Sequence, residues 1–244
     1  MSLIPARRGA PPRWVAVVEP LVVLALVLLY SWPLRGRGPA VVVIVVLVLL
    51  SHWWRRETPA ALGFRRERFG RCMREFGPVV ALVGAAIVWE GVGDGSLPPG
   101  VTFGRGAAVL AGYSLWGLVQ QWALGGYFVN RFAEGFGGRR YGRQWAALAA
   151  ALCFALAHLP NRYLVAPTFV LGLLSALAYL RHRNLLFLGL AHGVLGTLLV
   201  LFVAPSLPQG LRTGSGASRA GVSGASPSRP PTASPTPLLP PRAP

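Results

Sequence analysis

The chain has 244 residues, of which 53% are hydrophobic and 13% are charged, about half the charged share of a typical soluble domain. Its mean hydropathy is +0.51, which excludes an ordinary soluble globule and a disordered chain. The net charge is +17, and every basic side chain is Arg. Because the arginines lie between long apolar runs and form no continuous basic face, they indicate a membrane protein and no nucleic-acid partner.

Apolar runs long enough to cross a bilayer follow one another along the chain, since a hydrocarbon core of about 30 Å needs about 20 apolar residues per helix. The sequence contains seven of them: 14–34, 39–54, 78–92, 107–130, 144–160, 163–180 and 184–204. The predicted fold is therefore all-α, a polytopic membrane bundle of about seven transmembrane helices. The first run is too long for a signal peptide and no Ala-x-Ala site follows it before Arg35, so we expect it to be retained.

The distribution of Arg predicts the orientation in the membrane. With seven spans, the N-terminus and the loops 55–77, 131–143 and 181–183 share one side and carry 16 arginines, against 8 on the other side. Because basic residues accumulate on the cytoplasmic side, we expect the N-terminus to be cytoplasmic and the C-terminus outside. The expected location is the cell (inner) membrane.

Three regions follow from these patterns. Residues 1–77 hold two predicted transmembrane helices and a basic loop, 55–77, which is either an amphipathic segment lying on the membrane or a solvated connector. Residues 78–204 form the helical core. Residues 205–244 contain ten Pro, seven Ser and five Gly, and this composition predicts a disordered tail.

Polar side chains inside membrane spans are costly, so each one needs a reason. Gln120 and Gln121 lie in the fourth run, His158 ends the fifth and is followed by Asn161, and His192 lies in the seventh. At 1.5 Å per residue, the two glutamines and the two histidines fall near the midplane or somewhat beyond it. The pattern leaves two interpretations open: interhelical hydrogen bonds that only join the helices, or a shared functional site.

Two short motifs resemble those of the CPBP intramembrane proteases, also called the Abi or CAAX prenyl protease family. The segment Phe154-Ala155-Leu156-Ala157-His158 matches the Phe-x-x-x-His motif of that family. Leu188-Gly189-Leu190-Ala191-His192 is similar to its last motif, in which a His lies in a late helix. The order of the motifs and the preceding basic loop are similar too, and the resemblance covers roughly residues 78–204.

The chain departs from the family pattern at three features. The family's first motif is Glu-Glu-x-x-x-Arg, whereas the matching stretch here begins with Gln120-Gln121 and has Gly125 in place of the Arg. Its third motif has Asn or Asp four residues after the His, whereas this chain has Gly196. Neither Gln can act as a base, because an amide does not take up a proton at accessible pH.

The resemblance implies peptide-bond hydrolysis within the membrane, in which a Glu activates water while His and Asn stabilise the oxyanion. The site residues carried over are Gln120, Gln121, His158, Asn161 and His192, with a His replacing Glu as the base. The predicted function is a divergent intramembrane endopeptidase that cleaves a membrane-associated or C-terminal segment of a protein.

Two other functions stay open. One is a non-catalytic relative that binds a membrane segment or lipid, and the other is a small transporter. We expect no cofactor and no metal, because two His and an amide make a poor zinc site. Whether the chain is an enzyme depends on whether catalysis survives without the Glu pair. Glu134, which follows the fourth run, is expected to be solvated.

Overall fold

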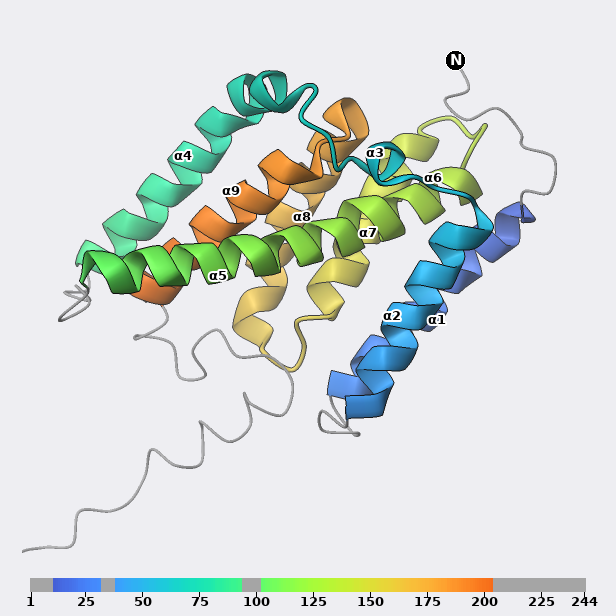
Figure 1. The fold of residues 1–244 in the computed structure, drawn as a ribbon, viewed down its shortest axis with the longest axis horizontal. Helices are drawn as coiled ribbons and strands as arrows, with labels where there is room; N and C mark the ends of the chain where they lie inside the picture. The colour runs from blue at the N-terminus through green and yellow to red at the C-terminus, as the bar shows by residue number, and fades with distance from the viewer. Residues whose placement is uncertain (1–10, 32–37, 94–101, 204–244) are drawn as a thin grey trace, which may run out of the picture.

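The computed structural model describes residues 11–31, 38–93 and 102–203, and within these ranges every regular element is helical. Figure 1 shows the helices as one bundle. Their bounds are α1 Arg13–Ser31, α2 Gly38–Trp54, α3 Pro59–Leu62, α4 Phe69–Gly93, α5 Phe103–Gln121, the π-helix η1 Trp122–Val129, α6 Asn130–Gly135, α7 Gly142–Leu156, α8 Arg162–His182, α9 Leu185–Leu198 and the π-helix η2 Leu199–Val203. The predicted disordered tail, 205–244, lies outside the described residues.

Each of the seven apolar runs contains a helix, so the all-α prediction is confirmed. Among the described residues, four helical segments are long and apolar enough to cross a membrane: Arg13–Ser31, Phe69–Gly93, Arg162–His182 and Leu185–Val203. The helices at 41–54 and 142–156 are apolar but shorter. The protein is therefore an integral membrane protein, whereas the count of seven spans stays a prediction.

The third predicted helix begins earlier than its apolar run. It starts at Phe69 instead of residue 78, so the second half of the basic loop is helical and continues into the span, with Pro78 inside the helix. Arg71 and Glu75 on this first part form an ion pair one turn apart, Nε to Oε1 at 3.2 Å. Such pairs support a helix at the membrane surface, and charged residues of this kind are what ended the apolar run in the sequence.

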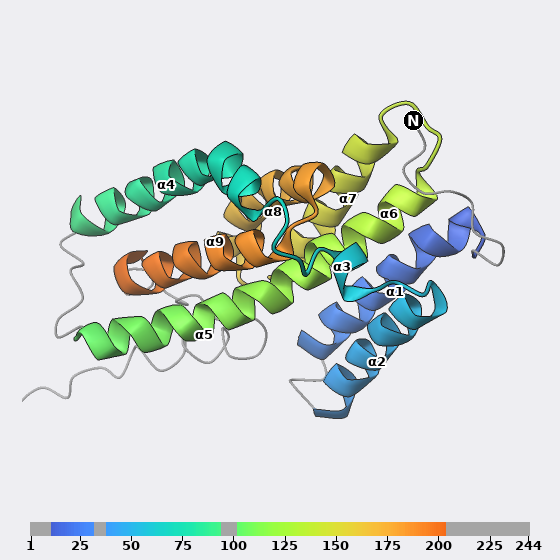
Figure 2. The same ribbon diagram turned by 45° about the horizontal axis from the view of Figure 1, so that its top comes forward.

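Helices α5 and α9 form a closely packed pair and lie side by side in both Figure 1 and Figure 2. Glycines make this close approach possible. A Cβ atom on Gly189 would lie 2.8 Å from the Leu118 Cα, and one on Gly117 would lie 2.7 Å from the Gly189 carbonyl oxygen. Helices in a membrane pack closely through such small residues.

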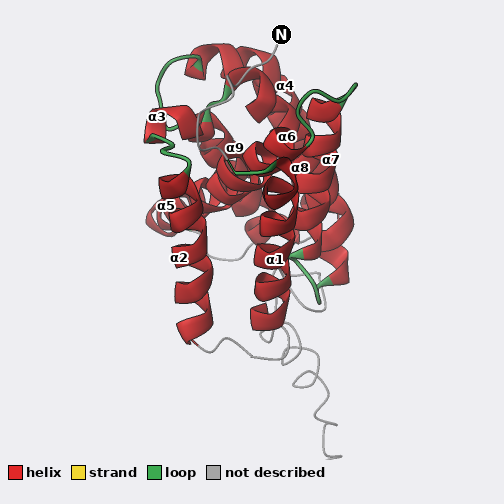
Figure 3. Cartoon of the chain, turned by 90° about the vertical axis from the view of Figure 1, so that its right-hand side faces the viewer, coloured by secondary structure: helices red, strands yellow, loops and turns green. Residues whose placement is uncertain are grey.

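The remaining helices pack against α9 or against one another, and more than half of the α5 side chains are exposed. α4 packs against α9 on one side, and α7 packs along α8. At the other end of the molecule α1 packs against α6 and against α2, and Figure 3 shows these two N-terminal helices side-on. Among the described side chains of α2, 41–54, most are exposed and only Val48, Ser51 and His52 are buried, as expected for a helix that faces lipid.

Candidate functional site

The contact between α5 and α9 brings two of the predicted site residues together. Gln121 is the last residue of α5, and its Nε2 lies 3.3 Å from Nδ1 of His192 on α9. The same nitrogen donates to Oγ of Ser175 on α8 at 3.5 Å. Gln121 is only 2% exposed, and its Oε1 has no hydrogen-bond partner among the described residues. The Gln121 amide therefore joins α5, α8 and α9, and its buried Oε1 stays available as a hydrogen-bond acceptor.

The second His joins this site through Phe154. The Phe154 ring packs edge-on against the rings of His158 and His192, with centroids 4.9 and 6.2 Å apart. His158 is buried in the turn after α7, and His192 is half-buried. The Phe and the His of the Phe-x-x-x-His motif thus both face the same region, next to the His of the last motif.

The hydrogen bonds of the two rings place their protons differently. Nδ1 of His158 lies 2.7 Å from the carbonyl oxygen of Phe154, which can only accept, so this Nδ1 carries the proton and Nε2 keeps its lone pair. The structure orients the Gln121 amide with Nε2 toward His192, so Nδ1 of His192 accepts and its Nε2 carries the proton. In this arrangement one imidazole offers a base and the other a hydrogen-bond donor.

The other two predicted residues take different positions. Gln120 is half-buried, and its side chain makes no hydrogen bond to any described residue. Asn161 is fully buried just before α8, and its backbone N–H donates to the carbonyl oxygen of His158 at 3.1 Å. The structure thus separates the two adjacent glutamines: Gln121 lies in the site with the histidines, and Gln120 does not bond to them.

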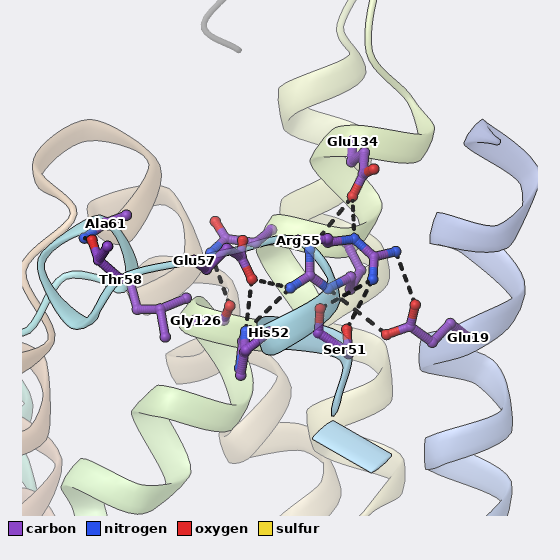
Figure 4. A network of polar contacts seen from close by, with 12 residues as sticks. Glu19, Ser51, His52, Arg55, Glu57, Thr58, Ala61, Gly126 and Glu134 are labelled. Carbon is purple, nitrogen blue, oxygen red and sulfur yellow. Dashed lines mark hydrogen bonds and ion pairs between the residues drawn. The ribbon is translucent and has the colours of Figure 1, made fainter. Parts of the chain in front are cut away.

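A buried network of ion pairs, which the sequence analysis missed, lies beyond the other end of η1 (Figure 4). Arg55 binds Glu19 through Nη2 and Glu134 through Nε, both at 2.9 Å. Arg131, 1% exposed, binds Glu57 and Glu134 and lies 3.8 Å from Glu19. The expectation that Glu134 is solvated was therefore wrong, because two arginines hold its carboxylate at 21% exposure. Most of these partners, such as Arg55 with Glu134 and Arg131 with Glu57, lie more than 70 residues apart, so no local pattern in the sequence indicates the network.

The neighbours of Glu57 in this network lower the pKa of its carboxyl. Burial raises the pKa of its carboxyl, but the hydrogen bond from His52 and the positive charge of Arg131 outweigh burial, so the pKa lies below its usual 4.5. His52 donates from Nδ1 to Glu57 Oε2 at 2.7 Å. Its ring lies 5.6 Å from the ring of Trp122, the residue that follows Gln121. The network thus contacts the segment that begins at the site.

The fold and the site define a class: an all-helical integral membrane protein with a polar site formed by His and Gln side chains from separate helices. A family model described as type II CAAX prenyl endopeptidase Rce1-like matches residues 106–198. No curated protein and no solved structure matches the chain. The match confirms the resemblance to the CPBP family, and its range contains Gln121, Phe154, His158 and His192. Residues 106–198 of this membrane protein are therefore similar to the CAAX prenyl endopeptidases.

Proposed function

We propose that the protein is an intramembrane endopeptidase that cleaves a membrane-associated or C-terminal segment of a protein substrate. The observation that carries this proposal is the shared contact of His158 and His192 with the Phe154 ring, beside the bond from Gln121 to His192. These residues come from the motif positions of a protease family, and they meet although they lie on different helices. A site that only joined helices would not need both imidazoles around one ring.

The missing Glu pair requires another base, and His158 is the group with a free lone pair. In the proposed reaction, Nε2 of His158 takes a proton from water as the water oxygen bonds to the scissile carbonyl carbon. The N–H of His192 stabilises the oxyanion that forms. The carbon–nitrogen bond then breaks, and the proton on His158 passes to the leaving amine. A positioned base of this kind contributes about 10²–10⁴-fold to the rate.

Gln121 has a supporting role in this proposal. Its Nε2–H fixes the protonation state of His192, and its free Oε1 accepts a hydrogen bond from the attacking water or from the substrate backbone. The substrate reaches the site from the bilayer, so we infer a membrane-embedded protein or peptide as the partner. The cell membrane, with the N-terminus in the cytoplasm, is the proposed location.

The experiment pairs cleavage with stability on the same purified variants. The probes are a peptide that ends in a prenylated cysteine followed by three residues, and a transmembrane peptide without lipid. We expect His158→Ala and His192→Ala each to abolish cleavage of the probe that the wild type cuts, while the protein stays folded. His182→Gln is the matched control, because His182 bonds to Glu75 outside the site.

Two results would contradict the proposal. One is a wild-type protein that cuts neither probe. The other is a set of His→Ala variants that melt earlier, by about 1 kcal/mol per lost interhelical bond, yet still cleave at the wild-type rate. The second result would show that the polar residues only join the helices.

A further inference from the structure

We propose that Tyr179 is a positioning residue for Gln121: its ring packs on Gly125, and its hydroxyl fixes the π-helix that follows Gln121. The proposal deepens the proposed function, on which the role of Gln121 rests. Where the family's first motif has Arg, this chain has Gly125. A Cβ atom on Gly125 would lie 2.8 Å from the Tyr179 ring, so the ring occupies the space beside the missing side chain. Tyr179 is 1% exposed.

The π-helix η1 begins at Trp122, directly after Gln121. A π-turn changes the direction of every residue that follows it, and such turns occur often at functional sites. Because a π-helix is rarer than an α-helix, we expect side-chain contacts to stabilise η1. Nδ2 of Asn130 donates to the carbonyl oxygen of Gly126 inside η1 at 2.8 Å. The middle of η1 is therefore anchored by the side chain of the residue that directly follows the π-helix.

The hydroxyl of Tyr179 completes this anchor. It accepts from the second hydrogen of Asn130 Nδ2 at 3.1 Å and donates to the carbonyl oxygen of Leu62 at 2.9 Å. Oδ1 of Asn130 accepts from Arg183 at 3.0 Å, and Arg183 also binds the Ala61 carbonyl oxygen at 3.0 Å. Every polar atom of the Asn130 amide and of the Tyr179 hydroxyl is used. A buried network in which every member is satisfied favours one arrangement over others.

These contacts link Gln121 to the short helix α3 on the loop between α2 and α4. The path runs from Gln121 through η1 to Asn130 and Tyr179, and from there to the last carbonyl groups of α3. Loss of the hydroxyl leaves a buried donor of Asn130 and the Leu62 carbonyl unpaired. A Cβ at position 125 pushes the ring out. Both changes shift η1, and with it the Gln121 amide against His192.

The test reads His192 directly, with no need for a substrate. The full-length protein, labelled with ¹⁵N in its histidine rings and held in detergent micelles, gives ring-nitrogen signals. The ring-nitrogen signals that disappear in His192→Gln are those of His192. The chemical shift of Nδ1 then reports whether Gln121 donates a hydrogen bond to it. We expect Gly125→Ala and Tyr179→Phe each to move or broaden the His192 signal, while the signal of His182 stays in place. Gly112→Ala is the control, because its Cβ meets nothing within 4 Å.

The pair of substitutions gives the decisive comparison. If Gly125 is needed only because of the Tyr179 ring, Gly125→Ala has no added effect on the His192 signal in a Tyr179→Ala background. An unchanged His192 signal in Gly125→Ala and in Tyr179→Phe would overturn the proposal, and so would an equal effect of Gly125→Ala with and without Tyr179. Because the signal does not depend on cleavage, the proposed enzyme function stands or fails separately.

Discussion

Gln121 and Gln120 are neighbours in the sequence, but only one of them bonds to a His. Gln121 Nε2 lies 3.3 Å from His192 Nδ1, whereas Gln120 has no side-chain bond within the described ranges. We therefore expect Gln121→Glu to raise the rate of cleavage, because a carboxylate there can take the proton from the attacking water. Gln120→Glu is the matched control and should leave the rate unchanged. The measurement is kcat/KM on the probe that the wild type cuts.

The reverse result for the two glutamines would contradict this prediction. If Gln120→Glu raises the rate and Gln121→Glu does not, the carboxylate of the family acts from the other position. The hydrogen bond between Gln121 and His192 would then play no part in the reaction.

The residues of the site divide into those that the sequence predicted and those that it did not. His158, His192 and Gln121 were found because polar side chains in apolar runs are rare and because short motifs contain them. Ser175, Asn130 and Tyr179 gave no such signal, since a Ser, an Asn or a Tyr near a helix end has many ordinary uses. Only their contacts in the folded chain identify them.

At the scale of helices, the close pair of α5 and α9 holds Gln121 and His192 in contact. A Cβ on Gly193 would overlap the Ser114 backbone and side chain. We therefore expect Gly193→Ala to force the helices apart and to lower the free energy of unfolding by about 1–3 kcal/mol, as overpacking does. Thermal unfolding in detergent measures the change.

Gly112→Ala again serves as the control, because Gly112 lies on α5, the other helix of the pair, with open space at its Cβ. It should be neutral or slightly stabilising, since Ala forms helices better than Gly. Equal melting temperatures for Gly193→Ala and the wild type would show that α5 and α9 are not in tight contact.

The helices themselves were largely predictable, because long apolar runs in a membrane chain have few other structures available. Two features were not. The helix α4 extends back to Phe69 through charged residues, which hydropathy alone assigns to a loop. The fourth run contains the π-helix η1, whose geometry depends on Asn130 and Tyr179 and leaves no trace in the pattern of apolar residues.

At the scale of the whole molecule, the ion-pair network joins α1 and the end of α2 to α6. Because the pKa of Glu57 is lowered in the folded protein, its contribution to stability is present above pH 4.5 and is lost as the pH falls through the folded pKa. We expect the wild type to be more stable than Glu57→Gln at pH 7, and this difference to shrink in acid. Thermal unfolding between pH 7 and about 3 measures it. A difference that stays constant would exclude the carboxylate as its source.

The orientation in the membrane gives a second prediction at this scale. The excess of Arg at the N-terminus and in the loops on the same side predicts that the C-terminus lies outside the cytoplasm. Reporter fusions to the end of the chain should therefore signal from the non-cytoplasmic side. A cytoplasmic signal would mean that the number of spans is not seven.

The central claim is that His158 and His192 act in one hydrolytic site inside the membrane. Its most direct test incubates the purified protein with natural membranes in ¹⁸O-labelled water and searches by mass spectrometry for new protein ends. The claim predicts new C-terminal carboxylates that carry ¹⁸O with the wild type and are missing with both His158→Ala and His192→Ala. Labelled ends that persist in the folded variants, or a wild type that produces none, would contradict it.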